Sequence, residues 1–91
     1  MPQVHRLTDE NTAGAPITHT AQSTVYANNL LIGVNDSNVA GHGPGVHAGP
    51  LTANGSTDVF IENIPVNRKD DKDTCGHPRD IGSPDVFANG G

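Results

Sequence analysis

Residues 56–63 read STDVFIEN, and two further stretches of the chain follow the same pattern. Residues 23–29 read STVYANN, and residues 83–90 read SPDVFANG. Each stretch begins with a serine, continues with a valine and an aromatic residue, and ends with asparagine or glycine. Residues 25–36 also align with residues 59–70 without a gap, which indicates an internal repeat.

Each copy of the repeat predicts a β-hairpin. Asn29 and Asn63 stand where a tight turn is expected, because asparagine accepts the left-handed conformation that such turns need. A second apolar segment follows each turn, at residues 30–34 and 64–67. Two and a half copies are too few for an extended solenoid, so the sequence predicts a small, closed all-β domain of packed hairpins.

The valines of the repeat are the expected core. Alternate residues of a strand share one face, so the valine of each copy is expected to point toward a common axis. These residues are Val25, Val59 and Val86. The charged run at residues 68–73, in contrast, is expected to be a solvated loop.

The composition limits how stable such a domain can be on its own. The chain has 91 residues, enough for one domain over residues 1–91, and only 33% of them are hydrophobic. Its glycines and prolines interrupt any helical periodicity. A single cysteine, Cys75, excludes an intrachain disulfide. The domain is therefore expected to need a metal ion, an oligomer or a docking partner.

The charge pattern and the N-terminus exclude several classes of protein. The net charge is -5, and the Lys and Arg residues form no basic stripe, so nucleic-acid binding is not expected. Residues 1–6 lack the apolar core of a signal peptide. No apolar run reaches the roughly 20 residues that cross a bilayer. The sequence predicts a protein made in the cytoplasm without a signal peptide.

Two long polar loops carry a complete set of ligands for a tetrahedral metal ion. The first loop holds His42 and His47, and the second holds Cys75 and His77. Three imidazoles and one thiolate suit zinc, and iron would accept the same set. With all four positions filled by protein, no position is left for a reactive water. This favours a structural site in a protein without enzymatic activity.

Several alternatives compete with a structural zinc site. His19 could replace one of the other histidines as a ligand, although its threonine neighbours favour a strand. The histidines and Cys75 could also be exposed loop residues that bind no metal. The protein could instead be a zinc-dependent hydrolase with water as the fourth ligand, or a generic structural β-repeat module.

Residues 59–68 read VFIENIPVNR, which resembles the motif of the PAAR-repeat proteins. These are the small caps on the membrane-piercing spikes of contractile-tail phages and type VI secretion systems. Their Pro-Ala-Ala-Arg stretch follows a Val-Phe-x-Asn-Gly strand and turn. Pro65 and Arg68 match that stretch, while valine and asparagine replace the two alanines. Two further stretches are similar to the family's third repeat: DTCGH at 73–77 and GSPDVF at 82–87.

The resemblance covers residues 4–91 and implies a small, cone-shaped, all-β monomer with zinc near its apex. The family binds this zinc through three histidines and one cysteine, which are matched here by His42, His47, Cys75 and His77. The broad base is implied to cap the blunt end of a trimeric β-helical spike protein, giving a complex of three spike chains and one cap.

The implied cap would touch the target membrane only transiently and would catalyse no reaction. Its place would be the baseplate spike of a phage tail, as part of the virion, or the tip of a secreted type VI spike. Because the chain ends at Gly91, directly after the third copy of the repeat, a cap without a fused domain is expected.

Overall fold

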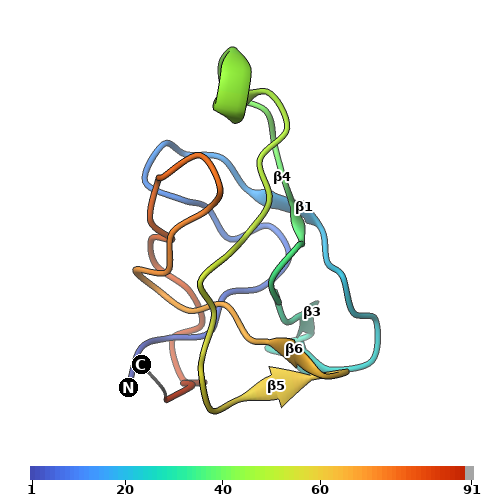
Figure 1. Ribbon diagram of the computed structural model, residues 1–91. Helices are drawn as coiled ribbons and strands as arrows, with labels where there is room; N and C mark the ends of the chain where they lie inside the picture. The colour runs from blue at the N-terminus through green and yellow to red at the C-terminus, as the bar shows by residue number, and fades with distance from the viewer. Residues whose placement is uncertain (90–91) are drawn as a thin grey trace.

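Short antiparallel hairpins and isolated bridges build the fold (Figure 1). The computed structural model describes residues 1–89. The strands are β1 (Ile17–His19), β2 (Tyr26–Ala27), β3 (Leu30–Leu31), β4 (Asn38–Val39), β5 (Phe60–Ile61) and β6 (Ile64–Pro65). The one helical element in this part of the chain is the short 3-10 helix η1 (Gly45–His47), so no described helix has the length to cross a membrane. The predicted all-β class is confirmed.

Two of the hairpins have their turns at the expected asparagines. Asn28 and Asn29 join β2 to β3, with φ angles of 55° and 65°. Glu62 and Asn63 join β5 to β6, with φ angles of 53° and 65°. Positive φ at both central residues is typical of a type I′ turn, whose twist matches that of the flanking strands. The turns predicted at Asn29 and Asn63 are confirmed.

The N-terminal segment completes the third copy of the repeat. Gln3 pairs with Phe87 in an antiparallel bridge, as Phe60 pairs with the returning strand β6 in the second copy. The main-chain nitrogen of Val4 donates a hydrogen bond to the oxygen of Val86, at 3.0 Å. The same bond recurs at 3.0 Å in the other copies, from Ile32 to Val25 and from Val66 to Val59. The third hairpin is therefore assembled from segments near the two ends of the chain.

A cycle of main-chain hydrogen bonds, the central ring, joins the three copies. It links His5, Gly33 and Asn67, which occupy equivalent positions in the copies. His5 N donates to Asn67 O (2.9 Å), Asn67 N to Gly33 O (2.9 Å), and Gly33 N to His5 O (2.8 Å). Gly33 fits because an added Cβ would lie 2.9 Å from the Cδ1 atom of Ile17. The closed cycle gives the domain a pseudo-threefold axis.

The apolar core lies between the hairpins of the three copies. Its buried members are Val4, Ala27, Ile32, Val34, Val66 and Ala88. Val59 and Val86 pack against this cluster, as the repeat predicts. Val25 does not, because its side chain is 39% exposed. The expectation that all three repeat valines point inward is therefore wrong for Val25.

The first copy differs because a glutamine replaces the serine of the other copies. In the second copy, the Oγ of Ser56 accepts a hydrogen bond from the main-chain nitrogen three residues on, at 2.9 Å. Gln22, and not Ser23, has this role in the first copy, because its Oε1 accepts from Val25 N at 2.9 Å. Its Nε2 donates to the oxygen of Ile32 at 2.8 Å. The Gln22 side chain is buried there, whereas Val25 lies at the surface.

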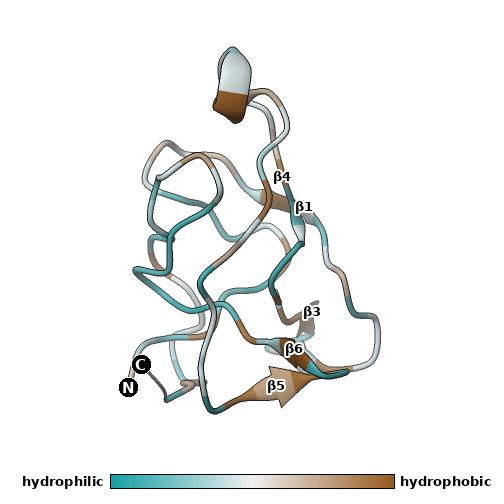
Figure 2. Cartoon of the chain, viewed as in Figure 1, coloured by the Kyte–Doolittle hydropathy of each residue, from teal (hydrophilic) through white to brown (hydrophobic). Residues whose placement is uncertain are grey.

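The domain narrows from the hairpins toward the loop that carries η1 (Figure 1). Its principal extents are 32 × 24 × 24 Å. Figure 2 shows apolar residues at β3, β5 and β6, at the wide end, and at β1 and part of η1 nearer the narrow end, among loops that are largely hydrophilic or neutral. The buried apolar residues toward the narrow end are Ala15, Ile17 and Val39, which lie outside the main cluster.

Candidate metal centre

Three loops, which we call the arms, extend from the central ring toward the narrow end. The first arm spans residues 10–16, the second residues 38–51 and the third residues 72–78. Before each arm lies a turn whose third residue has a positive φ, namely Thr8 (78°), Asp36 (69°) and Asp70 (74°). The first arm contains no histidine or cysteine, whereas the second and third arms carry the four predicted ligands.

The second arm folds back on itself so that its two histidines face the same space. The main-chain nitrogen of His42 donates to the oxygen of His47 at 2.8 Å, and η1 turns the chain between them. Gly41 lies against the returning chain, where an added Cβ would be 2.5 Å from the oxygen of Ala48. Glycine permits this close approach. Gly41 therefore helps to place the neighbouring His42.

The third arm presents Cys75 and His77 on a tight turn. The main-chain nitrogen of Asp73 donates to the oxygen of His77 at 2.9 Å and closes this turn. Two further bonds tie the third arm to the second: Thr74 N donates to Leu51 O (2.8 Å), and Leu51 N donates to Thr74 Oγ1 (3.0 Å). The two arms that carry the ligands are thus held side by side.

The structure brings His42, His47, Cys75 and His77 together, with all their ligand atoms within 4.8 Å of one another. Nε2 of His42 lies 3.1 Å from Nδ1 of His47 and 3.2 Å from Nδ1 of His77. Sγ of Cys75 lies 3.8 Å from Nδ1 of His77. Ideal zinc bond lengths give tetrahedron edges of about 3.4 Å between nitrogens and about 3.6 Å between sulfur and nitrogen. The group could therefore hold a metal ion.

A hydrogen bond orients the ring of His42 for this role. Its Nδ1 lies 3.1 Å from the main-chain oxygen of Ala40, and an N–H at Nδ1 donates to that oxygen. The unprotonated Nε2 then faces the other candidate ligands. Metal-bound histidines commonly donate their second nitrogen in this way, which fixes the tautomer and the ring plane. The local fold thus prepares His42 as a ligand.

The other two histidines lie elsewhere. His19 is exposed on β1 and is not among the residues that converge. His5 is fully buried, and its Nε2 lies 2.7 Å from the main-chain oxygen of Asp80. Burial lowers the pKa of His5 from its ordinary value of 6.5 to about 4. The alternative in which His19 replaces one of the four ligands has no support in this geometry.

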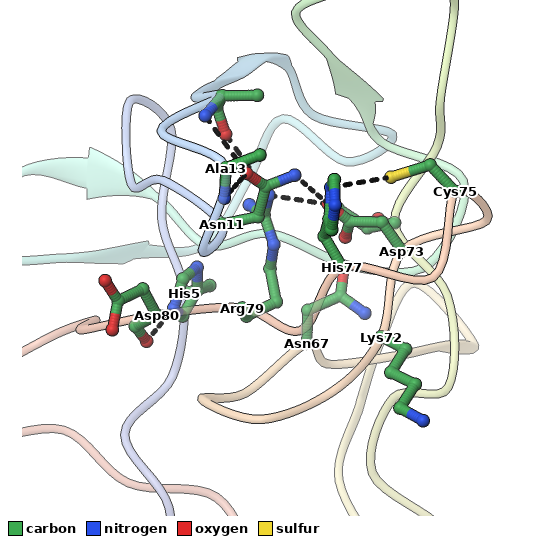
Figure 3. Close-up of polar contacts among 12 residues, drawn as sticks. His5, Asn11, Ala13, Asn67, Lys72, Asp73, Cys75, His77, Arg79 and Asp80 are labelled. Atoms are coloured by element: carbon green, nitrogen blue, oxygen red, sulfur yellow. Dashed lines mark hydrogen bonds and ion pairs between the residues drawn. The ribbon is translucent and has the colours of Figure 1, made fainter. Parts of the chain in front are cut away.

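A buried polar cluster lies beside the third arm (Figure 3). No local sequence pattern predicts it. Oδ2 of Asp73 accepts hydrogen bonds from Nη2 of Arg79 (2.7 Å) and from Nδ2 of Asn11 (3.0 Å). The side chains of Asp73 and Arg79 are both 0% exposed. Burial raises the pKa of Asp73, against the opposing effects of Asn11 and Arg79. Burial likewise lowers the pKa of Arg79, although Asp73 opposes that shift.

The charged run at residues 68–73, which the sequence predicts to be a solvated loop, is in part buried. Arg68 and Asp71 form a buried two-pronged ion pair, with Nε–Oδ2 at 3.0 Å and Nη2–Oδ1 at 2.9 Å. Asp73 is buried as well, whereas Asp70 is exposed. The prediction is wrong for Arg68, Asp71 and Asp73, because each forms an ion pair inside the fold. Asp70 and Lys72 are exposed, as predicted.

Comparison with known proteins gives one partial match. No family model matches the chain. The chain is 55% identical over 42 residues to a protein named double-stranded DNA deaminase toxin A, from Burkholderia cenocepacia (strain H111). The matched segment covers 46% of this chain and 3% of that protein. The chain is thus similar to a small part of a much longer protein whose name describes an enzyme.

Proposed function

We propose that this chain is the tip of a membrane-piercing central spike, stabilised by zinc and without enzymatic activity. Its wide end would cap the blunt end of a trimeric β-helical spike protein in the baseplate of a contractile tail or a type VI secretion system. One observation carries the proposal: a four-ligand set at the narrow end is combined with a threefold arrangement of exposed aromatic residues on the hairpins.

The aromatic residues supply the argument for a threefold partner. Tyr26, Phe60 and Phe87 occupy equivalent positions in the three copies and are 59%, 52% and 45% exposed. Exposed aromatics are typical anchors of protein interfaces. A partner built from three identical chains offers the same contact to each of them. Docking there would also cover the hairpin edges, which are otherwise open to unwanted pairing.

The ligand set supports a structural metal. Three imidazoles and a thiolate fill a tetrahedral shell and leave no position for a reactive water. The side chains of Asn11, Asp73 and Arg79, buried at the third arm, are polar, so the ligand turn packs on polar rather than apolar groups. A bound zinc supplies stiffness in a small volume, and its binding free energy, on the order of 10 kcal/mol, is also folding free energy.

The similarity to a deaminase toxin does not bring deaminase chemistry to this chain. Zinc deaminases hold their metal through two or three cysteines and use a glutamate from a His-x-Glu motif. This chain has a single cysteine, Cys75, and no His-x-Glu sequence. We infer that this chain serves as a structural module and not as a deaminase.

Metal analysis of the purified protein tests the first half of the proposal. We expect one zinc per chain, with iron as the alternative that the same ligands accept. A Cys75→Ser variant should retain less metal after gel filtration, because a hydroxyl is a much weaker zinc ligand than a thiolate. Purified wild-type chain without stoichiometric metal would refute the zinc-stabilised tip.

Light scattering after size-exclusion chromatography tests the second half. The chain is mixed with a trimeric β-helical spike protein of a contractile tail or type VI secretion system, and we expect a complex of three spike chains and one cap. Phe60→Asp should abolish the complex. Ile81→Asp is the matched control, because Ile81 is 68% exposed but lies outside the set of repeat aromatics. Equal binding by both variants, or no complex with the wild type, would contradict the capping role.

A further inference from the structure

Two buried charged residues flank the candidate ligands of the third arm. Asp73 precedes Cys75 by two positions, and Arg79 follows His77 by two positions. The main chain of Asp73 also holds the ligand turn, because its nitrogen donates to His77 O and its oxygen accepts from Gly76 N, both at 2.9 Å. A displacement of Asp73 would therefore displace the backbone that carries both ligands.

The side chain of Asp73 anchors this turn to the first arm, which has no ligands of its own. Its Oδ2 receives the hydrogen bonds of Asn11 and Arg79. The guanidinium of Arg79 reaches further, to the main-chain oxygens of Ala15 and Asp9, both at 3.3 Å. The third arm is thus fixed at Asp73 on one side and at Arg79 on the other, against a part of the chain some 60 residues earlier in sequence.

Stability alone does not explain the cluster of Asp73, Arg79 and Asn11, because burying its charged groups costs free energy. Within residues 1–89, the Oδ1 of Asp73 and the Nε of Arg79 are buried without a hydrogen-bond partner. Burying charged groups with unfilled hydrogen-bonding capacity costs free energy, and well-packed apolar residues often serve stability as well or better. Buried ion pairs are better attested as devices that select one arrangement of the chain. The arrangement selected here is the one that carries Cys75 and His77.

The ion pair between Arg68 and Asp71 has the same chemistry as the pair between Arg79 and Asp73 but a different position relative to the ligands. Arg68 and Asp71 have side chains that are 5% and 9% exposed, and they contact each other across a single turn. Arg68 also donates its main-chain nitrogen to Asp71 Oδ2 at 2.8 Å. This pair does not flank a ligand, so its loss should affect the fold without a specific effect on the metal centre.

We propose that Asp73 is a positioning residue of the metal centre, and that its carboxylate, clamped by Arg79 and Asn11, holds Cys75 and His77 in ligating geometry. The inference rests on the metal site of the proposed function. It distinguishes Asp73 from the other buried acidic residue, Asp71, by the effect of each on metal affinity and on coordination geometry. Outer residues that orient metal ligands typically alter metal affinity by about 10- to 100-fold.

The test compares Asp73→Asn with Asp71→Asn in the metal-loaded protein. Zinc affinity is measured by competition with a chromophoric chelator, and geometry is read from the absorption spectrum after replacement of zinc by Co(II). We expect Asp73→Asn to lower zinc affinity by about 10- to 100-fold and to shift the thiolate-to-cobalt band. Asp71→Asn should keep the wild-type spectrum, and its affinity should change no more than its loss of stability requires.

Asp73→Glu serves as the second variant and decides the matter if Asp73→Asn does not fold. It keeps the charge but moves the carboxylate by one methylene, so a positioning role predicts a weaker site with an altered cobalt spectrum. A wild-type spectrum in the Asp73 variants, or equal losses of affinity in the two asparagine variants, would overturn the proposal. Those results would contradict the positioning role of Asp73 but not the proposed zinc site. A wild-type protein that binds no metal would overturn both proposals.

Discussion

Nε2 of His5 lies 2.7 Å from the main-chain oxygen of Asp80, and the buried imidazole donates its Nε2 proton to that oxygen. His5 also belongs to the central ring through its main chain. Its Nδ1 is buried and has no hydrogen-bond partner in residues 1–89. Burial is the main reason why its pKa falls to about 4. Protonation of His5 would place an unsolvated charge inside the fold.

Acid should therefore weaken the fold through His5. Between about pH 6.5 and pH 4 the unfolded chain binds a proton at this imidazole and the folded chain does not, so stability falls as the pH falls through this window. The full loss from this group is about 3 kcal/mol. Urea unfolding at several pH values should show a steeper decline for the wild type than for His5→Gln, which keeps a donor but does not titrate. Release of metal by acid should affect the wild type and His5→Gln equally. Parallel curves of stability against pH for the two proteins would therefore contradict this prediction.

Removal of the metal should loosen the narrow end first. We expect a chelator to lower the Tm by more than about 10 °C, the equivalent of roughly 2 kcal/mol in a domain of this size. Hydrogen exchange should accelerate at the amides of His42 and Thr74, which hold the second and third arms. The amides of Gly33 and Asn67 in the central ring should stay protected. Restored zinc should reverse the change, whereas an unaffected fold would favour a generic β-repeat module.

A valine-to-alanine substitution should lower the stability of the fold much more at Val66 than at Val25. Val66→Ala removes buried methyl groups and should cost about 2 kcal/mol, because Val66 is 1% exposed. Val25→Ala should change stability by less than about 0.5 kcal/mol, because Gln22 and not Val25 fills the interior of the first copy. Chemical denaturation of the two variants measures the difference. Similar losses would mean that Val25 turns inward in solution.

Local chemistry made some of the fold predictable from the sequence. The turns at Asn29 and Asn63 could be predicted because the residue in the turn itself limits the backbone conformation. The candidate ligands could be named because few residue types bind zinc, and three of the five histidines and the single cysteine fall in two loops. Neither prediction needed knowledge of which distant segments meet.

Contacts between distant segments account for what the sequence did not reveal. The bridge between Gln3 and Phe87 closes the third copy, yet each half alone resembles an incomplete repeat. Asp73 lies in a charged run that looks solvated, and its partner Asn11 is 62 residues away. An alignment by residue type matches Ser23 with Ser56. The structure shows instead that Gln22 accepts the hydrogen bond that Ser56 accepts in the second copy.

Gly41 should matter for metal binding although it offers no ligand atom. An alanine Cβ there would lie 2.5 Å from the main-chain oxygen of Ala48, so the second arm would have to open where His42 and His47 face each other. We expect Gly41→Ala to weaken zinc binding by about tenfold or more, as for other changes that disturb ligand orientation. Gly49→Ala is the matched control, because an added Cβ at Gly49 meets nothing within 4 Å. Chelator competition measures both variants, and equal zinc affinities would show that the close approach at Gly41 does not position the ligands.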